Sequence, residues 1–211
     1  MNNKIKKILS KKNKTKIICL TSYSKNISEI LDKYSDIILV GDSLGSVLYS
    51  YNTTKNVTLN MMIEHSKSVR QGVKKSLMVV DMPYNSYNSK SEALKNAKKI
   101  IKYSKADAVK LEGGKKILSI IKHLRKNKIN VMGHLGILPQ SQIGKFRFKG
   151  KTTFERKRLL NDALLLQGSG VFSIVLECIE TKLAKEITKN LKIPTIGIGS
   201  SVNCDGQSFS Y

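Results

Sequence analysis

Short apolar runs that end on a carboxylate recur along this chain. Residues 37–40 are four consecutive apolar residues, Ile-Ile-Leu-Val, and a glycine and then Asp42 follow them directly. A run of this length, bounded by a turn residue, predicts a short strand that is buried on both faces. Three later apolar runs end in the same way, at Asp81, Glu112 and Glu177. Because α/β barrels carry their catalytic groups at the carboxyl ends of parallel strands, this recurrence predicts a catalytic site on a barrel.

Strand-like and helical segments alternate along the chain, which predicts parallel strands with crossover helices. Among the helices, we expect one over residues 28–34 and one that Thr58 caps, with His65 in it as a packed or solvated residue. Seven strands are identifiable, and residues 207–211 are a candidate stub of an eighth. A doubly wound open sheet would need a glycine-rich turn after the first strand, and residues 21–24, Thr-Ser-Tyr-Ser, are not one. We therefore expect one (β/α)8 barrel domain over residues 1–211, with a short helix at about residues 3–12. The chain is shorter than the roughly 250 residues of a typical barrel, so we expect a barrel that is truncated near its eighth strand.

The composition is strongly basic, with 38 Lys and Arg residues against 15 Asp and Glu and a formal net charge of +23. Such a charge suits phosphate contacts with nucleic acid. However, only five of the basic residues are Arg, the residue that recognises phosphates and bases in bidentate fashion. The lysines are also spread along the whole chain. We therefore expect non-specific adhesion to polyanions and no specific nucleic-acid partner.

Cysteine content and hydropathy indicate the cellular compartment. Cys19, Cys178 and Cys204 are odd in number and widely spaced, which suits neither a disulfide framework nor a zinc site. Reduced, buried thiols are typical of cytosolic proteins. No apolar run approaches the length of a membrane span, and residues 1–16 lack the apolar core of a secretory signal. We therefore expect a cytoplasmic protein without a membrane partner.

The acids after successive strands point to a metal site. In a barrel, one mouth would collect the side chains of Asp42, Asp81 and Glu112. Three carboxylates in one cleft repel one another, and Mg²⁺, which binds carboxylate, water and substrate oxygens, would relieve this repulsion. The alternative is that each acid only caps the helix that follows it. Glu177 lies apart from these three acids and is the candidate general base, since an apolar wall would raise its pKa toward working pH.

Two basic side chains accompany the acids. Lys110 lies two residues before Glu112, so the two side chains of a strand there point to the same face. His134 ends another strand-like run and is either a site residue or a hydrogen-bond partner of a loop. A lysine beside acids and a metal suits an anionic substrate, with a surface lysine as the alternative. The residues alone therefore predict a magnesium-dependent barrel that abstracts a proton from a small anionic substrate such as a keto acid.

Six sequence blocks resemble the 3-methyl-2-oxobutanoate hydroxymethyltransferase family. They occur in register, with nearly constant spacing, between about Lys4 and Gln207. Six blocks in order are a far more specific signal than any one of them. They are Val-Gly-Asp-Ser-Leu-Gly (40–45), Asp-Met-Pro (81–83), Val-Lys-Leu-Glu-Gly-Gly (109–114), Met-Gly-His-Leu-Gly with Pro-Gln-Ser (132–136 and 139–141), Leu-Glu-Cys (176–178) and Ile-Gly-Ile-Gly (196–199).

The resemblance implies a barrel of the phosphoenolpyruvate/pyruvate type and assigns a role to individual residues. It implies that Mg²⁺ is held through three acids, Asp42, Asp81 and Glu112. It implies that the keto acid contacts Asp42, Ser43, Asp81 and Lys110, with His134 supporting the substrate side. It also implies that Glu177 is the base that takes the substrate proton.

The resemblance further implies the reaction and the assembly. The co-substrate is 5,10-methylenetetrahydrofolate, whose one-carbon unit is attacked by a Mg²⁺-stabilised enolate of 3-methyl-2-oxobutanoate. The product is 2-dehydropantoate (ketopantoate), formed in the first step of pantothenate biosynthesis. The family assembles as a homodecamer, so a homo-oligomer is expected.

Several positions depart from the family pattern. Ser24 stands where an acid is usual, Leu138 replaces a usual Thr, and the loop over residues 142–151 is shorter than usual. The family's last helix and tail have no counterpart in these 211 residues, which would leave apolar strand faces uncovered. Two alternatives therefore stay open: a truncated, inactive subunit of this family, and another Mg²⁺-dependent keto-acid lyase or mutase of the same barrel superfamily.

Overall fold

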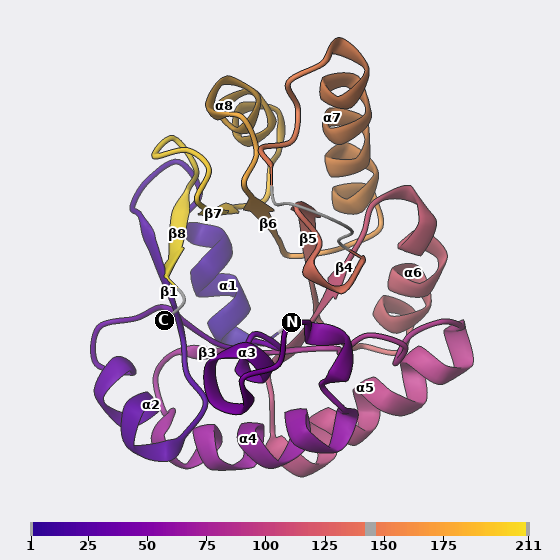
Figure 1. Ribbon diagram of the computed structural model, residues 1–211. Helices are drawn as coiled ribbons and strands as arrows, with labels where there is room; N and C mark the ends of the chain where they lie inside the picture. Colours follow the sequence, from indigo (N-terminus) through magenta and orange to yellow (C-terminus); the bar gives the residue numbers. More distant parts are fainter. Residues whose placement is uncertain (1, 142–146, 210–211) are drawn as a thin grey trace.

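Eight parallel strands form a closed barrel in sequence order, with the last strand beside the first (Figure 1). The computed structural model describes residues 2–141 and 147–209. The strands are β1 (Ile17–Thr21), β2 (Ile37–Val40), β3 (Leu77–Asp81), β4 (Ala108–Glu112), β5 (Val131–Gly136), β6 (Ser173–Glu177), β7 (Thr195–Ile198) and β8 (Gly206–Phe209). β8 closes the barrel because it pairs with β1 from Ile17 opposite Gly206 onward. The predicted (β/α)8 barrel is therefore confirmed.

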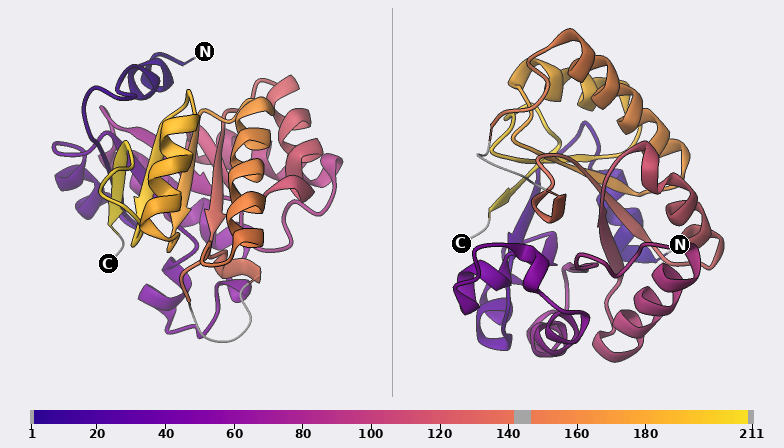
Figure 2. Two further views of the ribbon diagram at one scale, coloured as in Figure 1. Left: turned by 90° about the horizontal axis from the view of Figure 1, so that it is seen from above. Right: turned by 45° about the vertical axis from the view of Figure 1, so that its right-hand side comes forward.

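Helices surround the barrel wall, as the two views of Figure 2 show. The α-helices are α1 (Asn3–Ser10), α2 (Lys25–Leu31), α3 (Leu44–Tyr49), α4 (Leu59–Gly72), α5 (Lys90–Ser104), α6 (Leu118–Lys126), α7 (Thr153–Gly168) and α8 (Thr181–Asn190). Short 3₁₀ turns are η1 (Thr54–Asn56), η2 (Lys115–Ile117) and η3 (Pro139–Ser141). Helix α4 lies between α2 and α5 on the outside of the barrel and contacts both.

The strand β2 shows why apolar runs become barrel strands. All four of its residues are buried. Ile37 and Leu39 belong to the apolar cluster inside the barrel, whereas Ile38 and Val40 pack in the layer between the strands and the helices. Successive side chains of a strand point to opposite faces, so a strand buried on both faces needs an unbroken apolar run. Each such side chain stabilises the fold by about 1.5–3 kcal/mol.

Helix α1 closes the amino-terminal end of the barrel, and Figure 2 (left) shows it at the opposite end of the molecule from the loop after β5. Its Ile5 and Ile8 are fully buried in the apolar cluster of the barrel interior. Just beyond α1, the Lys12 ammonium donates to the buried carboxylate of Asp205 at 2.8 Å. The open end of the barrel is therefore the carboxyl-terminal mouth.

Local capping sets where the outer helices begin. Thr58, Ser89 and Thr152 each accept a hydrogen bond from the backbone N–H three residues later, at the start of α4, α5 and α7. A side-chain oxygen at this position satisfies a donor that has no partner within the helix. Two expectations needed correction: a helix expected over residues 28–34 lies at Lys25–Leu31, and the segment 44–56, for which no element was predicted, holds α3 and η1.

Part of the outer surface is apolar. In α2, Ile27 and Ile30 are 47% and 56% exposed. On β1 and β8, Ile18 and Phe209 are exposed as well. The uncovered strand faces expected from the sequence stay a prediction, because β8 ends at the last described residue.

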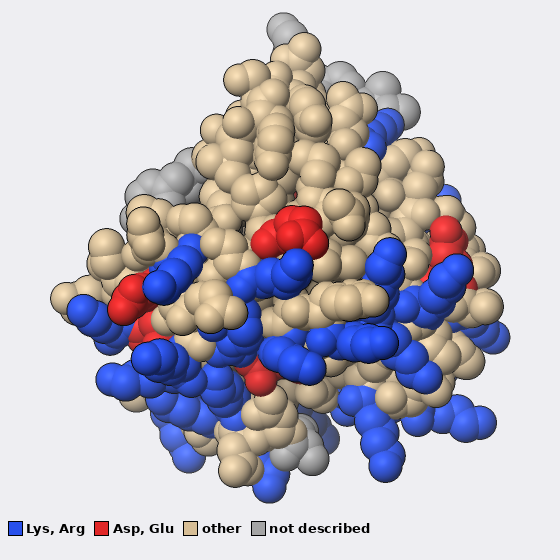
Figure 3. All heavy atoms as spheres, turned by 90° about the horizontal axis from the view of Figure 1, so that it is seen from below, with Lys and Arg blue, Asp and Glu red and all other residues tan. Residues whose placement is uncertain are grey.

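The charged surface is dominated by basic side chains. On the face seen in Figure 3, Lys and Arg side chains are dispersed over a broad area and acidic side chains are few. Over the described ranges, no helix has the length and apolar character needed to cross a membrane.

Candidate active site

The carboxylates predicted from the strand ends gather at the open mouth of the barrel. Asp42 lies two residues after the end of β2, Asp81 ends β3 and Glu112 ends β4, and all three are buried. The Asp42 backbone N–H donates to Asp81 Oδ2 at 3.2 Å. Parallel pairing places Lys110 opposite Asp81, and His134 of β5 opposite Glu112. The register of neighbouring strands therefore brings the predicted residues together.

Lys110 is the cation in this group of acids. Its Nζ lies 3.1 Å from Asp81 Oδ1. Burial lowers the pKa of Lys110, but the negative charges of Asp81, Glu112 and Asp42 outweigh it and the net shift is upward. Lys110 is therefore positively charged although it is buried.

His134 connects Lys110 with the acid that was predicted to be the base. Lys110 Nζ lies 3.1 Å from His134 Nδ1. An ammonium can only donate, so in the neutral form of the ring Nδ1 accepts from Lys110 and the proton lies on Nε2. Burial and the charge of Lys110 lower the pKa of His134, but the Glu112 and Glu177 carboxylates outweigh them and the net shift is upward. His134 Nε2 is 3.1 Å from Glu177 Oε2, an ion-pair distance without the alignment of a hydrogen bond. Glu112 approaches the other side of the ring, with 3.5 Å between its Oε1 and Nδ1.

Glu177 stands at the rim of the mouth, where its side chain is 19% exposed. It ends β6 and lies opposite Gly136 of β5. Gly136 has φ +103°, and a Cβ at this position would collide with the Glu177 carbonyl oxygen. A glycine is needed there because other residues rarely adopt this backbone conformation. The close approach of the two strands thus places Glu177 beside His134.

Ser43, the remaining predicted residue, precedes α3 and lies at the edge of the acid group. Its Oγ is 2.8 Å from the hydroxyl oxygen of Tyr23, which follows β1. The Tyr23 carbonyl oxygen in turn lies 2.8 Å from Nδ1 of His65 on α4. His65 is therefore a packing and hydrogen-bonding residue of a helix, as the sequence favoured. Tyr23 was not singled out as a site residue, because a tyrosine after a strand has no distinctive spacing.

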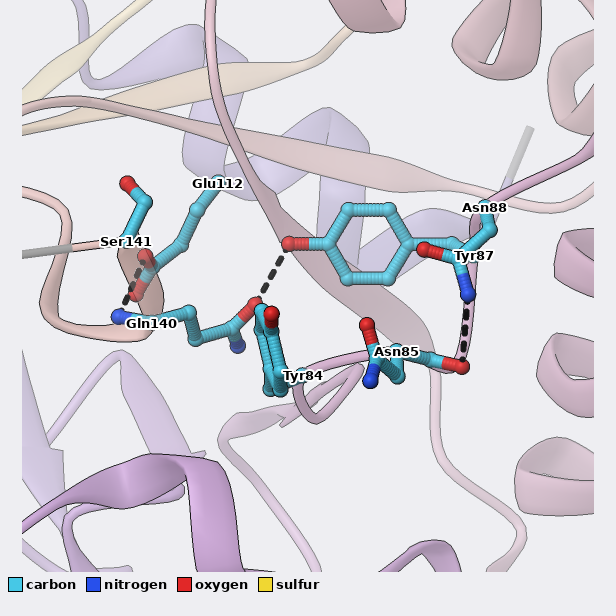
Figure 4. A pocket seen from close by; sticks show the side chains of 7 residues that line it. All are labelled: Tyr84, Asn85, Tyr87, Asn88, Glu112, Gln140 and Ser141. Carbon is cyan, nitrogen blue, oxygen red and sulfur yellow. Dashed lines mark hydrogen bonds between the residues drawn. The ribbon is translucent and has the colours of Figure 1, made fainter.

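Gln140 and Tyr87 are two further residues of the mouth that sequence reasoning missed (Figure 4). Gln140 lies in η3 and donates its amide hydrogens to Asp42 Oδ2 at 2.7 Å and to the Met82 carbonyl oxygen at 2.9 Å. The Tyr87 hydroxyl donates to Gln140 Oε1 at 2.6 Å. Both residues line a pocket that opens beside Glu112. Gln140 lay within one of the recognised sequence blocks, which was the only available signal.

The three clustered acids have different proton affinities. Burial, together with the charges of Asp81 and Glu112, raises the pKa of Asp42 to about 7. Burial also raises the pKa of Asp81, and the cation of Lys110 opposes this only in part. For Glu112, burial is outweighed by His134, Lys110 and the Gln140 backbone N–H, so its pKa is lowered. The raised pKa values of Asp42 and Asp81 show that Lys110 alone does not compensate the charge of three ionised acids.

The donor set fits a hard divalent cation. Asp81 Oδ1 is buried and, apart from its ion pair with Lys110 at 3.1 Å, has no hydrogen bond. The available ligand atoms are carboxylate oxygens, which Mg²⁺ prefers. Within residues 2–141 and 147–209, no three Asp, Glu, His or Cys side chains are already arranged so that they could hold a metal ion together. Mg²⁺ commonly binds one or two carboxylates and completes its shell with water and substrate oxygens. The chemistry of the donors therefore suits Mg²⁺ with substrate completing the coordination.

Two of the positions that depart from the family pattern follow barrel strands. Ser24 stands between β1 and α2, and its side chain makes no capping hydrogen bond. Leu138 lies between β5 and η3. In the short loop 142–151, residues 142–146 lie outside the described part of the chain. Ser24 replaces an acid of the family pattern, but the predicted acids, lysine and histidine of the site are not among these positions.

Comparison with known proteins decides the family. A family model described as ketopantoate hydroxymethyltransferase matches residues 2–211. The chain belongs to the ketopantoate hydroxymethyltransferase family. One relative, the 3-methyl-2-oxobutanoate hydroxymethyltransferase of Pelagibacter ubique, is 69% identical over 207 residues, which are 98% of this chain and 80% of the relative. The 3-methyl-2-oxobutanoate hydroxymethyltransferase of Rhizobium etli is 47% identical, over 90% of this chain and 71% of the relative.

Solved structures show that this ketopantoate hydroxymethyltransferase family member shares its fold with other barrels. 2,3-Dimethylmalate lyase, described as a PEP mutase/isocitrate lyase superfamily member, superposes with a TM-score of 0.73 at 12% identity, over 98% of this chain and 79% of the lyase. Phosphonopyruvate hydrolase, solved with oxalate and Mg²⁺, superposes with a TM-score of 0.71 at 9% identity, over 93% of this chain and 72% of the hydrolase. The predicted barrel fold is thereby confirmed.

Proposed function

We propose that this protein transfers a hydroxymethyl group from 5,10-methylenetetrahydrofolate to 3-methyl-2-oxobutanoate, giving 2-dehydropantoate (ketopantoate) in the first step of pantothenate biosynthesis. The 69% identical relative carries the name of this activity. The observation that carries the proposal is the geometry of the mouth. Its buried acids and Lys110 lie within one group, and His134 joins that group to Glu177.

The proposal assigns Mg²⁺ to the acids Asp42, Asp81 and Glu112. Phosphonopyruvate hydrolase, which has the same fold, was solved with Mg²⁺ and oxalate. Bound Mg²⁺ supplies Lewis-acid polarisation of the substrate carbonyl and stabilises negative charge on its oxygen. In this chain, burial raises the pKa values of Asp42 and Asp81. A cation bound between these acids would stabilise their ionised forms.

The remaining residues bind and orient the keto acid. Asp42, Ser43, Asp81 and Lys110 are its proposed contacts, and Lys110 supplies the fixed positive charge for an anionic substrate. Glu177 removes the proton from C3 of the keto acid, and the C–H electron pair becomes the enolate. His134 holds the Glu177 carboxylate at 3.1 Å and supports the substrate side.

The one-carbon transfer follows from the enolate. Its C3 forms a carbon–carbon bond with the methylene carbon of the folate, and water supplies the hydroxyl oxygen on that carbon. The two bonds from the methylene carbon to the folate nitrogens break, these nitrogens take up the C3 proton and one proton of the water, and tetrahydrofolate leaves. The proposal also includes a homodecamer in the cytoplasm, as the family resemblance implies. The three free cysteines, Cys19, Cys178 and Cys204, agree with a reducing compartment.

Transfer of a labelled carbon tests the proposed function. The protein is incubated with Mg²⁺, 3-methyl-2-oxobutanoate and ¹³C-labelled methylenetetrahydrofolate, and the label is followed by NMR. We expect labelled ketopantoate from the unmodified protein and from Glu64→Gln, which changes an exposed glutamate on α4. Cleavage or rearrangement of the keto acid without transfer of the label would favour a lyase or mutase. No reaction from folded protein would favour an inactive subunit.

A further inference from the structure

Gln140 contacts two of the three clustered acids at once. Its side-chain nitrogen donates to Asp42 Oδ2 at 2.7 Å, and its backbone N–H donates to Glu112 Oε2 at 3.1 Å. The same side-chain nitrogen also donates to the carbonyl oxygen of Met82, the residue after Asp81. A single buried residue of η3 therefore connects the ends of β2, β3 and β4.

The hydrogen-bond partners fix the orientation of the Gln140 amide. A carboxylate and a backbone carbonyl only accept hydrogen bonds, so the NH₂ group must face Asp42 and Met82. The amide oxygen then faces away, and there the Tyr87 hydroxyl donates to it at 2.6 Å. Figure 4 shows this arrangement, with Tyr87 reaching across the pocket to the Gln140 amide. Every polar group of the Gln140 side chain is therefore occupied in one orientation.

This arrangement has a consequence for the acid group. Neighbouring carboxylates repel each other. A hydrogen bond from a neutral amide fixes the orientation of a carboxylate and leaves its charge unchanged. Within the described residues, only Gln140 donates a side-chain hydrogen bond to the Asp42 carboxylate. Outer partners of this kind orient metal-binding side chains in proteins, and their loss typically weakens metal binding.

We propose that Gln140, oriented by Tyr87, is a positioning residue that fixes the Asp42 and Glu112 carboxylates for a divalent cation. The inference rests on the proposed function, because that function makes these two acids ligands. It adds that the turn after β5, through Gln140, determines how well the site holds the cation. Neither Gln140 nor Tyr87 touches the reacting atoms in this account.

Binding of Mn²⁺ without substrate tests this inference. Affinity is measured by isothermal titration calorimetry and by the electron paramagnetic resonance spectrum of the bound ion. Gln140→Met keeps the length of the side chain but removes the amide NH₂ and the amide oxygen. In this variant we expect the Mn²⁺ affinity to fall about 10- to 100-fold. In Tyr87→Phe, which leaves the amide but frees its orientation, we expect a smaller loss of about 2- to 10-fold.

Tyr84→Phe is the matched control, because Tyr84 lines the same pocket and has no hydrogen bond to Gln140 among the described residues. Its Mn²⁺ affinity and spectrum should equal those of the unmodified protein. Circular dichroism confirms that each variant is folded, and Tyr87→Phe keeps the test informative if Gln140→Met does not fold.

Two results would overturn the inference: unchanged Mn²⁺ affinity in the folded variants, or no Mn²⁺ binding by the unmodified protein. The proposed function fails differently. If the unmodified protein binds Mn²⁺ and the variants weaken it, yet no hydroxymethyl transfer occurs, the positioning role stands and the proposed function does not.

Discussion

Lys110 is the residue on which the electrostatic balance of the mouth depends. It is buried with its Nζ 3.1 Å from Asp81 Oδ1, and it is the cation among Asp81, Glu112 and Asp42. Removing one partner from a buried ion pair is strongly unfavourable, because the remaining charge stays buried without compensation. The same side chain thus stabilises the fold and supplies positive charge for an anionic substrate.

We therefore expect Lys110→Met to lower the free energy of unfolding by about 3–5 kcal/mol in the absence of divalent cations. Lys116→Met, which changes an exposed lysine after the same strand, should change it by less than about 0.5 kcal/mol. Urea denaturation of both variants with a chelator present measures the difference. Equal stability of the two variants would contradict this assignment.

Individual site residues were predictable to different degrees. Asp42, Asp81, Glu112 and Glu177 follow mainly apolar runs, and that pattern alone placed them at strand ends. Gln140, Tyr87 and Tyr23 lie in loops or turns without periodicity. Their roles depend on contacts between segments far apart in the chain, such as residue 140 with residue 42, which one sequence does not reveal.

At the scale of elements, the carboxylate of Asp32 ties the end of α2 to the segment that leads into β3. It accepts hydrogen bonds from the backbone N–H groups of Lys74, Lys75 and Ser76, at distances between 2.8 and 3.2 Å. Burial alone would raise the pKa of Asp32, but these N–H donors outweigh it and lower the pKa below its usual value. The ionised form is therefore favoured by folding.

The sign of the pH dependence follows from this lowered pKa. The stabilisation is complete above the unfolded pKa of about 3.9 and is lost as the pH falls through the lower, folded value. We expect Asp32→Asn to cost about 1.5–3 kcal/mol at pH 7, and the cost to shrink below about pH 4. Urea denaturation at several pH values, with Glu64→Gln as control, measures it. A cost that grows toward acid pH would contradict the argument.

Elements were predictable where a periodic pattern or a cap was present. The apolar run of residues 37–40 gave β2, and Thr58 marked the start of α4. The segment 44–56 was missed because α3 and η1 are short and their sequence has no repeated apolar period. The helix expected at residues 28–34 lies at Lys25–Leu31, and two of the apolar residues behind that expectation, Ile27 and Ile30, are exposed.

In the whole molecule, α1 fills one end of a closed barrel and the acid group lies at the other end. Closure depends on β8, whose Gly206 pairs with both Ile17 and Ile196, and α1 fills the opposite end from the acids. The net charge is +23, and on the face seen in Figure 3 the Lys and Arg side chains lie mainly over its lower part. Weak, salt-sensitive adhesion to polyanions stays a prediction. The sequence indicated the barrel through its alternation, but not that so short a last strand completes it.

Proton exchange at C3 of the keto acid tests the central claim most directly. The protein is incubated in D₂O with Mg²⁺ and 3-methyl-2-oxobutanoate, without folate, and the C3 proton signal is followed by NMR. Because Glu177 is the proposed base, the unmodified protein and Glu64→Gln should exchange this proton, and Glu177→Gln should be slower by about 10²- to 10⁴-fold. Absence of exchange in the folded, unmodified protein, or equal exchange in Glu177→Gln, would contradict the account.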